Sequence, residues 1–240
     1  METQLSAKSM DYDTESGEFQ ASGSVALKRL QITITSDFAR ANSKTQKARM
    51  WQNVKGFGTH LGEKLSFACD ALDSDFSVKD GDYTLQGGVD AVFGSRHLVA
   101  DIARLRGRQF YARPVTKFED VQRKLILSCD SLVGNYDAQG LRQFTGNGNV
   151  YVKQINVKNE VTEIWGDKLI YSREKGTLTA TGNARAVQKG RRITAKGLVY
   201  HVNTGRLEAQ GTPRITVDLS QSSNKTQKQP ALPKQEKRRP

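Results

Sequence analysis

The chain has 240 residues, of which 36% are hydrophobic and 8% aromatic, and its formal net charge is +12. This length suits one all-β domain or two small domains, and the low apolar content requires a core that is thin or elongated. No run of about 18 apolar residues occurs, so no transmembrane segment is expected. The first residues carry no basic and apolar leader, which fits a cytosolic protein or a secreted protein without its signal peptide.

Seven related units follow one another along the chain. Each has an Asp or Lys anchor, 29 to 37 residues from the next, with an apolar residue three positions before it, a small residue one before and an apolar residue two after. Self-similarity at such a period predicts a repeat architecture. The anchors are Lys8, Asp37, Asp70, Asp101, Asp130, Asp167 and Lys196. The first apolar column is Leu5, Ile34, Phe67, Leu98, Leu127, Ile164 and Ile193. The small column is Ala7, Ser36, Cys69, Ala100, Cys129, Gly166 and Ala195. The second apolar column is Met10, Ala39, Leu72, Ala103, Leu132, Leu169 and Leu198.

Each unit is expected to supply about two β-strands, because its segments alternate apolar and polar residues and are separated by turn residues. Residues 38–51 and 99–107 are locally ambiguous between helix and strand, but their columns align with the others and favour strand. Hairpin turns are expected at residues 174–176 and 203–205, which end in glycine. The predicted fold is all-β, with roughly 14 or more antiparallel strands in one domain over residues 1–218.

The two apolar columns would point to opposite faces of a regular strand. Because both are apolar, a bend or bulge near the anchor is expected to turn both inward. A stack of such strands encloses an apolar interior. The residues alone do not distinguish an open groove from a closed core, since both use the same side chains.

The last residues form a basic tail. Residues 221–240 hold six Lys or Arg and one Glu, with Ser, Gln and Pro and almost nothing apolar. Such a segment cannot repay its ordering entropy, so residues 219–240 are expected to be disordered.

The two cysteines suggest a redox or metal pair, but the repeat offers a simpler explanation. Cys69 and Cys129 stand in the small column, whose other members are Ala, Ser and Gly. They lie two units apart, about four strands or roughly 19 Å in a regular stack, which is beyond disulfide reach. We therefore expect no disulfide, metal site or cofactor.

The segments "GDKLIY" (166–171), "LTATGNARAV" (178–187) and "ITAKGLVYHVNTGRLEAQG" (193–211) resemble the OstA-like family. That family includes the periplasmic lipopolysaccharide transport protein LptA, the periplasmic part of LptC and the amino-terminal domain of LptD. Its Gly-Asn step recurs at residues 148–149 and 182–183 but is Gly-Ser at 23–24 and Gly-Gly at 87–88. The likeness is good over residues 120–217 and looser over 5–119.

The resemblance implies a β-taco, or open β-jellyroll, whose greasy groove shelters the acyl chains of lipopolysaccharide in the periplasm. It also implies end-to-end stacking with LptC-like or LptD-like components or with the same protein. A soluble LptA-like member fits best, because the sequence shows neither the membrane helix of LptC nor the barrel of LptD.

Three sets of residues follow as candidates for that function. The groove-lining candidates are Ile34, Phe67, Leu72, Leu98, Leu127, Leu132, Ile164, Leu169, Ile193 and Leu198. The candidates for pairing with head-group phosphates are Arg104, Arg106, Arg108, Lys189, Arg191 and Arg192. The candidates for assembly at the first and last strands, which have an open edge, are Leu5, Met10, Ile215 and Val217.

Other functions are also consistent with parts of the sequence. A β-solenoid scaffold with a closed core would share this fold, and lipid A binding would separate the two. A nucleic-acid binder would suit the charge, but it would need exposed aromatic residues among the basic ones, and the aromatics are few and scattered. An enzyme is not expected, because His60, His97 and His201 are isolated and the Asp column repeats in the manner of a turn or bulge contact.

Overall fold

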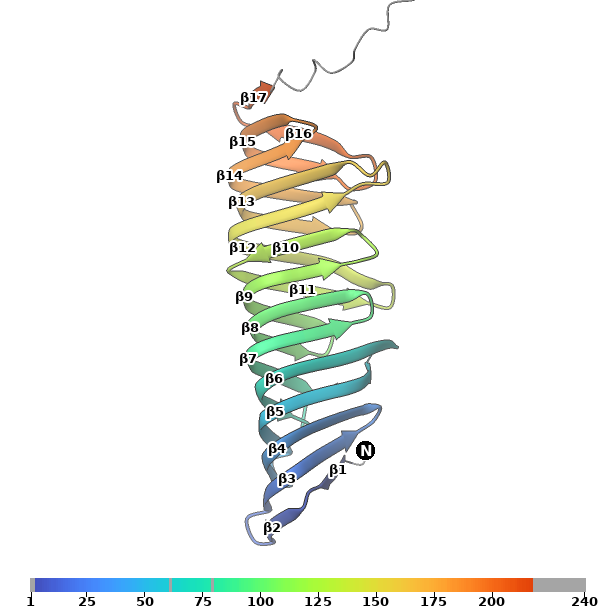
Figure 1. The fold of residues 1–240 in the computed structure, drawn as a ribbon, viewed down its shortest axis with the longest axis vertical. Coiled ribbons are helices and arrows are strands. Elements are labelled where there is room, and N and C mark those ends of the chain that lie inside the picture. Colours follow the sequence, from blue (N-terminus) through green and yellow to red (C-terminus); the bar gives the residue numbers. More distant parts are fainter. Residues whose placement is uncertain (1–2, 61, 79, 218–240) are drawn as a thin grey trace, which may run out of the picture.

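The computed structural model describes residues 3–60, 62–78 and 80–217. These residues form a single 17-stranded sheet whose paired strands are all antiparallel. The sheet is a tall stack folded along its length, with β2 at one end and β17 at the other (Figure 1). Within the described residues, no helix is long and apolar enough to cross a membrane. The expected basic tail lies outside the described residues.

The strands follow one another in chain order along the stack. Their bounds are β1 (Thr3–Ser6), β2 (Ser9–Asp13), β3 (Glu18–Arg29), β4 (Ile32–Asn42), β5 (Lys47–His60), β6 (Glu63–Asp75), β7 (Asp82–Phe93), β8 (Arg96–Arg106), β9 (Gln109–Asp120), β10 (Leu125–Cys129), β11 (Ser131–Asp137), β12 (Gly140–Ile155), β13 (Val161–Ser172), β14 (Thr177–Gln188), β15 (Arg191–His201), β16 (Arg206–Gln210) and β17 (Arg214–Val217).

The seven predicted units are present, each as one anchored strand and one return strand. Fourteen such strands give seventeen because three are interrupted at the bend, as the pairs β1 and β2, β10 and β11, and β16 and β17. The ambiguous segments 38–51 and 99–107 lie mainly in strands β4, β5, β8 and the turn between β4 and β5, as their columns predicted.

The predicted bend coincides with the anchors. Between β13 and β14 the register shifts so that two residues of β13, including Asp167, face three of β14, which is a β-bulge. Gly182 and Asn183 both have a positive φ there, 70° and 47°. The Asn183 amide donates to the Asp167 carboxylate at 3.0 Å. Asn53 contacts Asp37 in the same way, at 2.6 Å, so these two Asp anchors make bulge contacts, as predicted for the column.

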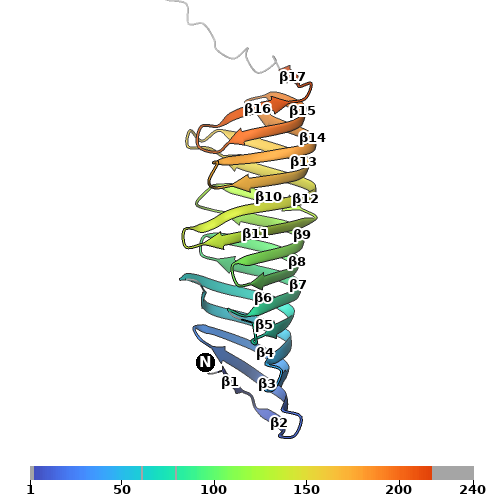
Figure 2. The ribbon, with the colours of Figure 1, turned by 180° about the vertical axis from the view of Figure 1, so that it is seen from behind.

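The bends face one side of the stack and the hairpin turns line the other, so the folded sheet is V-shaped in cross-section (Figure 2). Both apolar columns point between the two walls of the V. The interior holds one continuous cluster of buried apolar side chains, running from Ala21 on β3 to Tyr200 on β15. We call the gap between the two rows of hairpin turns the mouth of the V.

Candidate functional site

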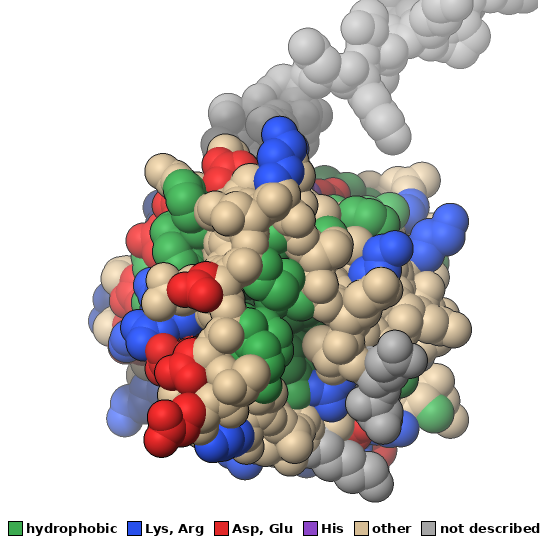
Figure 3. All heavy atoms as spheres, turned by 90° about the horizontal axis from the view of Figure 1, so that it is seen from below, with side chains coloured by type: hydrophobic (Ala, Val, Ile, Leu, Met, Phe, Trp, Pro, Cys, Tyr) green, Lys and Arg blue, Asp and Glu red, His purple; other side chains and the backbone are tan. Residues whose placement is uncertain are grey.

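The interior of the V is hollow at the end that holds β2. A cleft of about 1160 Å³ lies between the walls there and is lined by residues from Thr3 to Tyr83, including Leu27, Ile32 and Phe76. Figure 3, which views the molecule from this end, shows apolar side chains gathered along a furrow between polar margins. This volume is slightly above the usual range for ligand pockets, about 300–1000 Å³.

A smaller pocket of about 110 Å³ continues the cleft further along the stack. The two cavities share Ile32, His60 and Tyr83 in their linings. The pocket is almost wholly apolar, with side chains such as Leu65 and Phe93 on its walls. A hollow of this kind gains free energy by enclosing hydrocarbon, about 25 cal/mol for each Å² removed from water.

The ten predicted lining residues all belong to the interior cluster or pack against it, but they divide into three groups. Ile34, Phe67 and Leu98 line the pocket. Ile193 is half-buried and packs against the cluster. The remaining six are fully buried and fill the space between the walls; they are Leu72, Leu127, Leu132, Ile164, Leu169 and Leu198. The two cavities are lined by residues of β1 to β9 and their turns, and by Tyr136 on β11. We call β1 to β9 the hollow half and β10 to β17 the filled half, although Leu72 on β6 is itself fully buried.

Several residues that line the pocket were not among those predicted from the sequence. Ile32 and Leu65 line it and stand two positions before Ile34 and Phe67 on the same strands. Period-two alternation would have found them, since residues i and i+2 share a face. Phe110 on β9 and Tyr136 on β11 also line the pocket, but they belong to no uninterrupted column.

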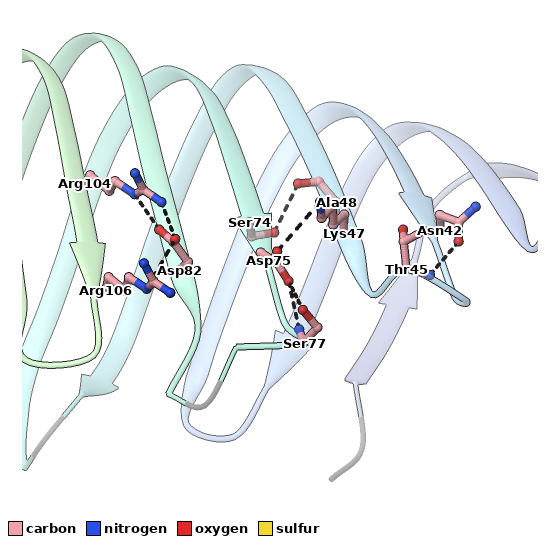
Figure 4. A network of polar contacts seen from close by, with 10 residues as sticks. All are labelled: Asn42, Thr45, Lys47, Ala48, Ser74, Asp75, Ser77, Asp82, Arg104 and Arg106. Atoms are coloured by element: carbon pink, nitrogen blue, oxygen red, sulfur yellow. Dashed lines mark hydrogen bonds and ion pairs between the residues drawn. The ribbon is translucent and has the colours of Figure 1, made fainter.

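The six basic head-group candidates lie at opposite rims of the mouth, and several are already paired. Arg104 donates from Nε to Asp82 at 2.8 Å, and Arg106 lies 3.9 Å from the same carboxylate (Figure 4). The hydrogen bond from Arg104 lowers the pKa of Asp82. On the other rim, Lys189 pairs with Glu160 at 2.6 Å.

The other three basic candidates are Arg108, in the turn after β8, and Arg191 and Arg192 at the start of β15. All six candidates are exposed at their respective rims. The structure therefore does not gather the six into one phosphate-binding cluster.

The end strands each pair on one side only among the described residues. β1 and β2 pair with β3, and β16 and β17 pair with β15. Ile215 and Val217 are exposed on β17, and Pro213 lies just before that strand. Leu5 and Met10 line the cleft at the opposite end. Both ends therefore present backbone groups that could pair with another strand.

The cysteines are free and buried, as their column predicted. Each thiol donates to a carbonyl two residues on, Cys69 to Ala71 and Cys129 to Ser131, both at 3.2 Å. Ser36 makes the equivalent bond to Phe38 at 2.8 Å. Burial raises the pKa of Cys69 to about 11 and that of Cys129 to about 12, so neither is a reactive thiolate at neutral pH.

A long antiparallel stack folded into a V around an apolar interior defines the open β-jellyroll, or β-taco, class. Residues 68–206 match the family described as LptA/(LptD N-terminal domain) LPS transport protein. The match spans more than half of the chain, and the chain belongs to this family. Its class of function is therefore lipopolysaccharide transport in the Lpt system.

Among solved structures, the chain is similar to LptH from Pseudomonas aeruginosa, described as the LptA homologous periplasmic component of the conserved lipopolysaccharide transport device. The identity is 14%, the alignment covers 78% of this chain and 94% of that chain, and the TM-score is 0.34. Comparison with curated proteins gave no significant match.

Proposed function

We propose that the hollow half binds the acyl chains of lipid A and that the protein carries or bridges lipopolysaccharide across the periplasm to the outer membrane. The observation that carries this proposal is the apolar cleft at the β2 end, in a member of a lipopolysaccharide transport family. Each exposed methylene of an acyl chain costs about 0.8 kcal/mol in water. A cleft that covers the chains removes this cost without any covalent step, so the proposed role is not enzymatic.

The open edges support a role for the stack in assembly. Backbone groups on β1 and β2, and on β16 and β17, are free to extend the sheet end to end with an LptC-like or LptD-like component or with a second copy. Such a junction would continue the walls of the V from one protein to the next. The polar head group of the lipid would remain at the mouth, in water.

Photo-crosslinking tests the proposal directly. A photoreactive residue at Phe67, which lines the pocket, should crosslink to lipopolysaccharide in cells that make it. Phe57 is the matched control, because it is 55% exposed and pairs with the outward-facing Ser66 beside Phe67. Lipid crosslinks from Phe67 and none from Phe57 are expected. Crosslinks to protein alone from both positions would overturn the proposal and favour a scaffold with a closed core.

A further inference from the structure

A set of charged and aromatic side chains crosses the mouth at mid-height. Arg96, Asp120 and Arg123 lie on one rim, at the turns that follow β7 and β9, while Tyr136 and Tyr171 lie near the other rim, at the ends of β11 and β13. We call these five residues the clasp. The first three residues belong to one wall of the V and the two tyrosines to the other. Contacts between the two groups therefore join the walls.

Arg123 makes the direct link between the walls. Its Nε donates a hydrogen bond to the Tyr171 hydroxyl at 2.9 Å, and its guanidinium lies 5.7 Å from the centre of the Tyr171 ring. The same guanidinium donates from Nη1 to Asp120 at 2.6 Å. The ion pair with Asp120, on the same rim, therefore holds Arg123 in place for its contact with Tyr171.

Arg96 makes a second link. Its guanidinium lies 5.3 Å from the centre of the Tyr136 ring, across the mouth, and donates to Glu63 at 2.7 Å on its own rim. Its Nε lies 3.8 Å from Asp120 and has no hydrogen-bond partner among the described residues. Two arginines and two carboxylates thus form a neutral cluster in which the Arg96 side chain is 6% exposed and that of Asp120 is 0% exposed.

The clasp lies where the hollow half meets the filled half. The lining of the pocket ends at Phe118 and Tyr136. Fully buried large side chains also occur before this point, as at Ile34, Met50 and Leu72. Beyond it, Leu125, Leu127 and Leu132 are fully buried and line neither cavity. Phe118 packs at 5.8 Å against Phe144, which stacks at 5.1 Å on Tyr171. These three aromatic rings therefore cross the interior of the V, and the clasp closes the mouth at the same level.

Other contacts also cross the mouth but differ in kind. In the hollow half Arg29 donates to the Phe76 carbonyl at 3.1 Å, and in the filled half Gln188 donates to the Gly205 carbonyl at 3.0 Å. Neither involves a fully buried carboxylate. Buried ions lose hydration on folding and regain it when water enters, so a charged closure separates at a smaller cost than an apolar seam of the same area.

We propose that the clasp is a gate on the lipid path: closed, it confines acyl chains to the hollow half, and its release lets them pass between the walls of the filled half. This inference rests on the proposed function. Tyr171→Phe removes the hydrogen bond from Arg123 but keeps the ring and its stacking on Phe144. Arg123→Met removes both the bond and the charge. Arg40→Met is the control, because Arg40 is exposed, stands between the inward-facing Ala39 and Ala41, and pairs with Glu18 at 2.8 Å on the outer face.

The first measurement needs no lipid. The buried thiol of Cys129 lies in the filled half and that of Cys69 in the hollow half. Both gate variants should speed maleimide labelling of Cys129 about tenfold or more, as loss of a charge-assisted hydrogen bond implies, and leave Cys69 unchanged. Tyr171→Phe must retain the wild-type circular dichroism spectrum. Unchanged labelling of Cys129 in both variants would overturn the gate, whatever the lipid result.

The second measurement uses lipid A with a diazirine at the end of an acyl chain and maps the crosslinked peptides by mass spectrometry. Wild-type protein and Arg40→Met should be labelled on β4 to β9, whereas the gate variants should also be labelled on β12 to β15. Labelling of β12 to β15 in the wild-type protein would overturn the gate and leave lipid binding in place. Absence of any lipid crosslink would overturn the proposed function, and the gate on a lipid path with it.

Discussion

Asn183 donates a hydrogen bond of 3.0 Å to Asp167 across the bend between β13 and β14, and both residues hold this position because Gly182 turns the return strand. The same pairing joins Asn149 to Asp130 at 3.0 Å. Two members of an acidic column that could be mistaken for a row of catalytic carboxylates are thus contacts within the bends of the sheet. The groove depends on these bends, because they turn both apolar columns inward.

Gly182→Ala should destabilise the protein more than Gly190→Ala does. Both glycines have a positive φ, 70° and 72°, and alanine in this region costs roughly 1–2 kcal/mol. A Cβ at Gly182 would also lie 2.4 Å from the Asp167 carboxylate, whereas one at Gly190 meets nothing within 4 Å. Urea denaturation should show a loss at Gly182→Ala at least about 1 kcal/mol larger. Equal losses would contradict the proposed role of the Asp167 contact.

The double variant Cys69→Ala, Cys129→Ala should fold with a loss of about 1 kcal/mol or less at pH 7, since alanine occupies this column in three other units. Its stability should also depend less on pH in alkali. Burial raises the two pKa values to about 11 and about 12 from an ordinary value of 9.0, so the folded state holds these protons more tightly than the unfolded state does. This stabilisation is complete below pH 9 and is lost as pH rises toward 12. Urea denaturation of the wild-type protein and the double variant at pH 7, 9.5 and 10.5 measures this difference. The same dependence of the free energy of unfolding on pH in both proteins would refute the prediction.

The sequence was sufficient to predict the repeat, the bends and the inward columns, because each is a local pattern repeated seven times. It could not show where the interior is hollow. Arg96 and Leu125 occupy the same column, five positions before their anchors, yet one closes the mouth over a pocket and the other is fully buried. That difference depends on which side chains meet across the V, and these are far apart in the chain.

The head-group candidates show the same limit in electrostatic terms. Arg104 and Arg106 stand in a basic run, "RLRGR", which suggests free positive charge. Their partner Asp82 comes from the neighbouring strand β7, 22 residues from Arg104. A cross-strand ion pair of this kind requires the register of the sheet, which local charge counting does not provide.

Leu169→Ala and Leu98→Ala should differ in their effects, because one residue lies in the filled half and the other in the hollow half. Leu169 is fully buried, and its truncation should lower the free energy of unfolding by about 2–5 kcal/mol because it leaves an enclosed cavity. Leu98 already borders the pocket, so its truncation should cost less, roughly 1–2 kcal/mol. Urea denaturation of the two variants provides the comparison. A larger loss at Leu98 would mean that the walls are closed at the level of β8.

Ala91→Phe should weaken lipid A binding without unfolding the protein. Ala91 lines the pocket beside Phe67, its partner on the adjacent strand, and a phenyl ring there would occupy space that the proposed function assigns to an acyl chain. If two methylenes of the acyl chain remain exposed to water, at about 0.8 kcal/mol each, the affinity for lipid A should fall about tenfold. Ala68→Phe is the matched control, since Ala68 pairs with the exposed Asp90 on the outer face, directly beside the Phe67 and Ala91 pair. Fluorescent lipid A titration should show the loss for Ala91→Phe alone, with unchanged urea midpoints for both variants. Equal affinity in the two variants would place the lipid outside the pocket.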